Sequence, residues 1–177
     1  MKTNGLFRHE NNLILTLSLI LIFLLAGSDL KAQTTTDFSG KWKFDLKKSN
    51  LGEGTQYWVG DEILDITQNS SSVTVARILL RSGSEDFKST ETFILDGKEK
   101  ITKEDFGTSR ITAKWSEDKK SFTVTNLATT VFNGVSKDYL VADTYKLSDK
   151  GITLTIESYS KNDSTGERTT TMVYNRQ

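Results

Sequence analysis

Hydrophobic and polar residues alternate along most of the chain that follows residue 36. The first clear example is the stretch Asp37–Leu46, in which Trp42, Phe44 and Leu46 would point to one side and charged residues to the other. A period of two residues is typical of a strand that is buried on one face only. The apolar face of this opening strand therefore needs a partner surface, which later strands would supply.

The same alternation recurs in short segments that are separated by clusters of Gly, Asn, Asp and Ser. Such residues favour turns because they tolerate positive φ or bond their own backbone. We predict further strands at residues 62–68, 73–80, 87–95, 98–103, 109–116, 122–130, 139–147, 152–159 and 168–175. No helical period is present in this part of the chain, so the sequence predicts an all-β domain of about ten strands.

Two dipeptides, Asp96-Gly97 and Asn133-Gly134, are strong signals for two-residue hairpins, because both central residues of a type I′ turn need positive φ. Consecutive hairpins imply an antiparallel up-and-down meander. The outer strands of a meander expose unpaired backbone groups unless the first and last strands pair. We therefore predict closure into a barrel, with a two-sheet sandwich as the alternative.

The N-terminal region has the features of a secretory signal peptide. Lys2 and Arg8 precede an apolar run from Leu13 to Ala26. This run is shorter than the about 20 apolar residues of a membrane-spanning helix. Cleavage after Ala32 or after Ser28 is compatible with the sequence, and an uncleaved signal anchor is the alternative.

We adopt residues 1–32 as a cleaved signal peptide and residues 33–177 as one domain, secreted or periplasmic, with no stable membrane insertion after cleavage. A hydrophobic content of 36% over 177 residues provides enough apolar surface for one core. The net charge is zero, without a basic block, which argues against a nucleic-acid partner.

Residue types that are missing restrict the chemistry further. The chain has no cysteine and no proline, and its one histidine, His9, lies in the predicted signal peptide. The mature protein would therefore have no disulfide, no Ser-His-Asp or Cys-His arrangement, and no zinc site of imidazole or thiolate type. Only Asp, Glu, Lys and Tyr remain for acid–base work, so we expect a protein that is not an enzyme and has no metal or cofactor.

Two segments resemble lipocalin-like (calycin-type) barrels. Phe38–Asp45, which contains Gly40-x-Trp42, is similar to the opening strand of these proteins, and the chain ends with Met172–Gln177. The mature length also resembles that of small exported bacterial domains of this type. In calycins a Trp of the first strand packs under an Arg of the last, and the resemblance gives this barrel-closing role to Trp42 and Arg176, together with Gly40. The alternative is a core Trp and a solvated terminal Arg.

Two departures separate the chain from fatty-acid-binding proteins. Those proteins have two helices after the first strand, whereas the connection at residues 47–60 is short and rich in glycine. They also hold the ligand carboxylate with an Arg two residues before the Tyr of the last strand. Here Met172 has that place before Tyr174, so the resemblance does not carry a fatty-acid function.

Aromatic residues of the predicted strands would line the barrel. Together they would either surround a small apolar ligand or fill the core without a cavity. The proposed lining is Phe44, Phe93, Trp115, Phe122, Tyr139, Tyr145 and Tyr174.

Charged residues also interrupt the apolar faces of some strands. An inward Arg77 would need a carboxylate partner, and we favour an outward orientation. Two inward carboxylates among Asp65, Asp143 and Glu157 would indicate acid–base chemistry, but the solvent face is the expected place for each.

Together these observations predict an exported, monomeric lipocalin-like protein that binds a small, mostly apolar molecule. The alternative is an envelope structural or interaction module with a filled core, which would use loops or an uncovered strand edge.

Overall fold

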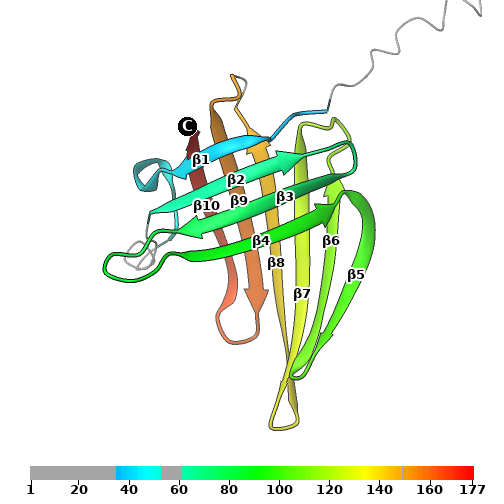
Figure 1. The fold of residues 1–177 in the computed structure, drawn as a ribbon. Coiled ribbons are helices and arrows are strands. Elements are labelled where there is room, and N and C mark those ends of the chain that lie inside the picture. The colour runs from blue at the N-terminus through cyan, green and yellow to red at the C-terminus, as the bar shows by residue number, and fades with distance from the viewer. Residues whose placement is uncertain (1–34, 53–60, 149) are drawn as a thin grey trace, which may run out of the picture. The chain divides into compact units, whose positions relative to one another are not determined.

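Ten antiparallel strands and one short 3-10 helix make up the described part of the chain (Figure 1). The computed structural model describes residues 35–52, 61–148 and 150–177, and the predicted signal peptide lies outside them. Among the described residues, no helix is long and apolar enough to cross a membrane. The elements are β1 (Gly40–Phe44), η1 (Leu46–Lys48), β2 (Glu62–Gln68), β3 (Ser72–Leu79), β4 (Phe87–Ile94), β5 (Asp96–Glu104), β6 (Gly107–Trp115), β7 (Ser121–Phe132), β8 (Val135–Leu147), β9 (Thr153–Asn162) and β10 (Gly166–Arg176).

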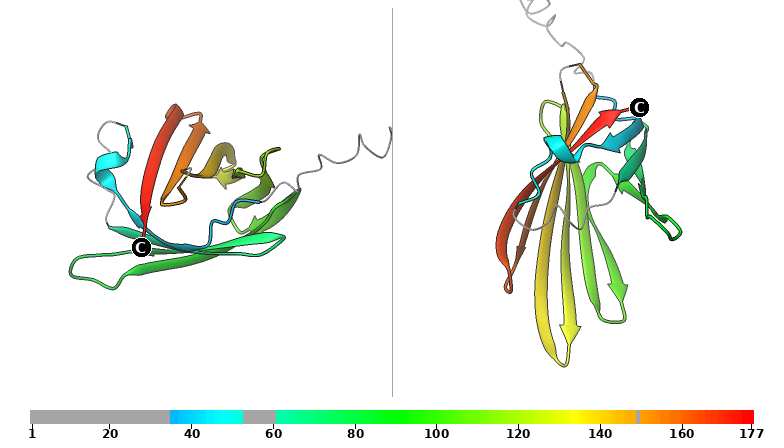
Figure 2. Two further views of the ribbon diagram at one scale, coloured as in Figure 1. Left: turned by 90° about the horizontal axis from the view of Figure 1, so that it is seen from above. Right: turned by 90° about the vertical axis from the view of Figure 1, so that its left-hand side faces the viewer.

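All ten strands belong to one sheet with the order β4-β3-β2-β1-β10-β9-β8-β7-β6-β5. The first strand pairs with the last, which places Trp42 opposite Arg176. The sheet therefore curls into a nearly closed barrel around an interior (Figure 2, left). The predicted all-β meander and the pairing of its two ends are confirmed, and the sandwich alternative is wrong.

Closure is incomplete between β4 and β5, which are the two ends of the strand order. Figure 1 shows the chain passing directly from β4 into β5, after which the two strands run apart. The hairpin predicted at Asp96-Gly97 is therefore wrong. Asp96 Oδ1 accepts a hydrogen bond from the Lys98 backbone N–H (2.9 Å), and only Gly97 of the pair has positive φ (73°). The dipeptide thus forms a bulge in β5 opposite β6, as a glycine in the left-handed region allows.

The hairpin predicted at Asn133-Gly134 is confirmed. Both residues have positive φ, 50° and 75°, as a type I′ turn requires, and Phe132 pairs directly with Val135. Because this turn is tight, β8 begins at Val135 and is longer than the strand predicted from residue 139.

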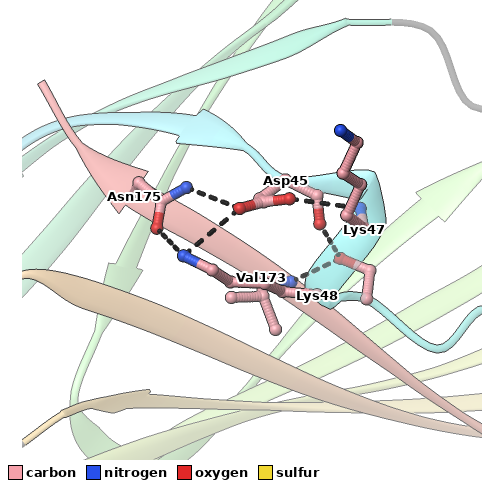
Figure 3. A network of polar contacts seen from close by, with 6 residues as sticks. Asp45, Lys47, Lys48, Val173 and Asn175 are labelled. Atoms are coloured by element: carbon pink, nitrogen blue, oxygen red, sulfur yellow. Dashed lines mark hydrogen bonds and ion pairs between the residues drawn. The ribbon is translucent and has the colours of Figure 1, made fainter.

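The opening strand is shorter than predicted and ends at Phe44. Asp45 Oδ1 accepts the backbone N–H of Lys47 (3.1 Å) and so begins the turn η1. Asp45 also contacts the last strand, because its carboxylate accepts the amide N–H of Asn175 (2.8 Å) (Figure 3). The same carboxylate lies 3.3 Å from the ammonium of Lys48 in η1. Leu46, predicted to share the apolar face of Trp42, lies in η1 and is half exposed.

The hydrophobic core lies on the inner face of the sheet. Trp42 and Arg176 close this core where β1 meets β10. The Arg176 guanidinium lies 4.3 Å above the Trp42 ring and donates to the carbonyls of Ser39 and Gly151 (both 2.9 Å). Trp42 Nε1 donates to the Phe38 carbonyl (3.1 Å). The stacked arrangement predicted for Trp42 and Arg176 is therefore present in the fold.

The glycine that precedes this tryptophan leaves room for the arginine. Gly40 has φ +138°, and a Cβ atom there would lie 2.7 Å from Arg176 Nη1. A side chain at position 40 would therefore be strained and would displace the guanidinium.

Candidate ligand-binding site

A cavity of about 460 Å³ lies along the opening between β4 and β5. Its size is within the about 300–1,000 Å³ of common small-molecule sites. We name it the β4–β5 cavity. The residues that line it are Thr90, Glu91, Thr92, Phe93, Ile94, Lys98, Lys100, Ile111 and Ala113.

The apolar part of the cavity wall comes from β4 and β6. Phe93 and Ala113 are buried members of the core, and Ile111 packs against that core. Phe93 is on the inner face because it pairs with the buried Val73. Ala113 pairs with the buried Val124, and Ile111 lies two residues earlier on the same strand, so both share that face. The apolar wall of the cavity is therefore continuous with the barrel core.

Charged residues form another part of the wall, beside Thr90, Thr92 and Ile94 of β4. Lys98 and Lys100 of β5 lie two residues apart, so their side chains leave the strand on the same face. Glu91 of β4 is also exposed to solvent. The cavity thus combines an apolar wall with a charged, solvated rim.

The aromatic residues predicted as lining have four different positions. Phe93 lines the cavity. Four others are buried in the core: Phe44, Phe122, Tyr145 and Tyr174. Trp115 is partly buried against them. Tyr139 is 44% exposed, because the part of β8 near the Asn133-Gly134 turn extends beyond the packed core (Figure 1).

The buried aromatic rings pack directly on one another. Phe122 stacks on Tyr145 with ring centroids 4.5 Å apart, and it meets the edge of Phe38 at 4.9 Å. Phe44 and Tyr174 meet edge to face at 5.5 Å. Such pairs stabilise a core beyond the area that they bury. These rings therefore fill this part of the interior, and the cavity lies beside them.

An ion pair is built into the barrel interior next to this core. Arg77 Nη1 donates to Glu62 Oε1 (2.8 Å), and the Tyr174 hydroxyl donates to the same oxygen (2.9 Å). Glu62 is buried, and the Arg77 side chain is 33% exposed. The expected outward orientation of Arg77 is wrong, because Arg77 pairs with the buried Leu64 across the ladder and so shares the inner face. Glu62 supplies the carboxylate that an inward Arg77 needs.

Burial and this negative charge control the titration of the neighbouring groups. Burial, reinforced by Glu62, raises the pKa of Tyr174 far above its ordinary value. Burial and then the charge of Asp143 raise the pKa of Tyr145 in the same way. Burial alone would lower the pKa of Arg77, but Glu62 and the nearby tyrosines raise it overall. Both phenols therefore stay protonated and Arg77 stays charged at physiological pH.

The three carboxylates considered for acid–base chemistry do not meet in the interior. Asp143 pairs with Val124 on the inner face, and its Oδ1 is buried without a hydrogen-bond partner in the described part of the chain. Asp65 and Glu157 alternate with the buried Leu64 and Ile156 and so lie on the outer face. Within the described ranges, no cluster of three or more Asp, Glu or His side chains is placed to hold a metal ion.

Sequence reasoning missed most of the cavity wall. Ile111 and Ala113 were recognised only as members of an alternating strand, and Lys98 and Lys100 only as part of another. The position of the opening decides which strand residues border a cavity, and no local pattern marks that position. The sequence does contain one usable signal: Lys98 and Lys100 are two residues apart and so lie on the same face of a strand. It could be interpreted only once the position of the opening is known.

A comparison with solved structures relates this arrangement to a known architecture. The chain is similar to zebrafish ileal bile acid-binding protein, solved in complex with cholic acid, with a TM-score of 0.50 and 16% sequence identity. The match covers 80% of this chain and all of the zebrafish chain. The chain has a calycin-type fold. At this identity the likeness concerns the fold, so the calycin barrel is shown and its ligand is not.

Comparisons of the sequence alone give no further relatives. No protein-family model matches the chain, and no curated protein matches it. The calycin assignment therefore rests on the strand order, on the pairing of β1 with β10 and on the structural similarity.

Proposed function

We propose that the protein binds a small, mostly apolar molecule in the β4–β5 cavity, without catalysing a reaction on it. The observation that carries this proposal is a cavity of about 460 Å³ whose apolar wall joins the barrel core. Burial of an apolar ligand against Phe93, Ile111 and Ala113 would remove hydrophobic surface from water, which is worth about 25 cal/mol per Å². The zebrafish calycin, which was solved with cholic acid, supports the idea that such a barrel accepts a small ligand.

The test compares two variants that differ only in where a side chain is enlarged. Ala113→Leu adds volume inside the cavity. Ala142→Leu makes the same change on β8, but Ala142 lies three residues from the buried Tyr145 and therefore on the opposite, outer face of the strand. Protein purified from its own host is examined by native mass spectrometry. We expect a bound small molecule in the unaltered protein and in Ala142→Leu, and its loss in Ala113→Leu.

A second measurement covers the case in which the natural ligand is lost during purification. The fluorescence of the probe 1-anilinonaphthalene-8-sulfonate rises when it enters an apolar site. We expect the rise with the unaltered protein and with Ala142→Leu, and a weaker one with Ala113→Leu. Equal behaviour of the three proteins in both measurements would overturn the proposal.

We also propose that the protein acts as a monomer in the periplasm or outside the cell, after loss of residues 1–32. The charged start and the apolar run of the N-terminal region support export. Intact-mass analysis of protein recovered from the host should show a chain that begins at Gln33, or at Asp29 if cleavage follows Ser28. A full-length chain held in the membrane would contradict the proposal.

A further inference from the structure

The β4–β5 cavity touches five consecutive residues of β4, from Thr90 to Ile94. Side chains of a strand alternate between its two faces, so a pocket on one face would touch only every second residue. A cavity that touches all five must run along the edge of the strand. Its wall on this side therefore includes the backbone of β4.

The hydrogen bonds of the neighbouring ladder identify the backbone groups that face the cavity. The N–H of Leu95 donates to the Ser71 carbonyl (2.9 Å), and β3 and β4 pair without a register shift. In an antiparallel ladder the N–H and C=O of one residue point the same way, and successive residues alternate. The odd-numbered residues of β4 thus face β3. Thr90, Thr92 and Ile94 direct their N–H and C=O groups toward the opening.

These groups lie on an edge that no other strand of the described sheet covers, since β4 ends the strand order. Unpaired backbone groups of an edge strand are a template for another extended chain. The part of β4 that borders the cavity spans about 13 Å at the rise of a strand, which suits a peptide segment of a few residues.

We propose that β4 binds an extended peptide by strand addition, with an apolar side chain of the peptide in the β4–β5 cavity and an acidic one next to it. The apolar side chain would contact Phe93, Ile111 and Ala113. The next inward position of the peptide, two residues away, would lie by Lys98 or Lys100 of the opposite wall. This activity goes beyond the binding of a small molecule, although both ligands would use the same apolar wall.

The charges of the wall favour an acidic peptide. Lys98 and Lys100 outnumber Glu91, the one acidic side chain among the lining residues. Lys98 has a single weak ion pair, to Asp96 at 3.8 Å with the lysine almost fully exposed. Within the described residues, no carboxylate lies in ion-pair distance of Lys100. A carboxylate on the peptide would therefore gain an ammonium partner that the protein leaves available.

The experiment uses a short synthetic peptide in which threonine alternates with leucine and glutamate. Binding to the unaltered protein is measured by isothermal titration calorimetry. A second peptide carries N-methyl groups on the amides that would pair with β4. Because N-methylation removes the backbone donors and keeps the side chains, we expect it to weaken binding by about tenfold or more.

Protein variants test the two walls separately. Thr92→Pro removes one N–H that faces the cavity, and Thr92→Val removes only the hydroxyl, so the first should weaken peptide binding and the second should not. Lys100→Glu should weaken binding of the glutamate peptide and strengthen that of a matching lysine peptide. Lys103→Glu, on the outer face of β5, should do neither. Thermal unfolding of each variant shows whether it is folded.

Three results would overturn strand addition: no binding of the peptide at millimolar concentration, equal binding of the N-methylated peptide, or equal effects of Lys100→Glu and Lys103→Glu. Its failure is distinguishable from failure of the proposed small-molecule function. The Ala113→Leu comparison uses a small molecule without a peptide backbone, so its outcome does not depend on strand addition. Repeated with an uncharged fluorescent probe in place of the anionic sulfonate, it should also be insensitive to Lys100→Glu.

Discussion

The interior ion pair leads to a quantitative prediction. In Arg77→Met, the methionine keeps an apolar stem of similar length but removes the guanidinium that lies 2.8 Å from Glu62. Among the described residues, the buried carboxylate would then keep only the hydroxyl of Tyr174 as a donor. A buried charge without its counter-ion destabilises a fold, whereas an exposed pair contributes little.

The expected size follows from the burial of the two partners. Loss of one partner of a fully buried pair costs about 3–5 kcal/mol, and loss of an exposed pair costs about 0–1 kcal/mol. The Glu62 side chain is 9% exposed and that of Arg77 is 33% exposed. We therefore expect Arg77→Met to lower the free energy of unfolding by about 2–3 kcal/mol. For a domain of this size, that corresponds to a fall in Tm of about 4–12 °C.

A double-mutant cycle separates the pairing from other effects. Glu62→Leu should cost a similar amount, because it leaves the Arg77 charge inside the barrel. The double variant should cost about 1–3 kcal/mol less than the sum of the two single ones, since no unpaired charge remains. Urea unfolding followed by tryptophan fluorescence measures all four proteins. Lys41→Met is the control, because Lys41 and Asp65 form an exposed pair at 3.8 Å.

Two outcomes would refute this reasoning. If Arg77→Met cost no more than Lys41→Met, the interior pair would be as solvated as the surface pair. If the double variant cost the full sum of its single variants, Arg77 and Glu62 would act independently. Either result would mean that the carboxylate is not held as the structure shows.

Three further predictions concern the closure and packing of the barrel. Trp42→Phe removes the donor to the Phe38 carbonyl and part of the ring beneath the arginine, so differential scanning calorimetry should show a loss of about 2–4 kcal/mol. Asn175 donates to Asp45 and holds the pKa of Asp45 below its ordinary value, so this stabilisation is present at neutral pH and is lost as pH falls through the lowered pKa. Urea midpoints should therefore show Asp45→Asn to be less stable near pH 7 and equal to the unaltered protein near about pH 2. Gly107→Ala would place a Cβ atom 2.1 Å from the Thr129 carbonyl oxygen, so the strands must separate, and circular dichroism melting should show a loss above about 2 kcal/mol.

The strands themselves were predictable because each needs only its own residues to be recognised. The alternation around Trp42 and Phe44 and the turn at Asn133-Gly134 depend on neighbours in the sequence, and the structure confirms both. The closing contact of Trp42 with Arg176 followed from a resemblance between families. The structure shows the contact at 4.3 Å.

The candidate site was not predictable because it depends on which two strands fail to pair. Asp96-Gly97 has the sequence of a hairpin turn, but the register with β6 uses it as a bulge, and β4 and β5 separate. The orientation of Arg77 was misjudged for a related reason. The carboxylate of Glu62 stabilises the inward guanidinium. The sequence around Arg77 gives no indication that Glu62 lies beside it.

The joint between β1 and β10 has a kinetic consequence. Arg176 donates to the Ser39 carbonyl across 137 positions of sequence, and the Asn175–Asp45 contact spans nearly as many. The two strands can meet only when almost the whole chain is available, and contacts of such long range slow folding to the millisecond–second range. Until the last strand arrives, β1 has only one of its two neighbours and the tryptophan has no arginine above it. The barrel therefore stays incomplete until β10 has been synthesised, which would suit the export proposed above.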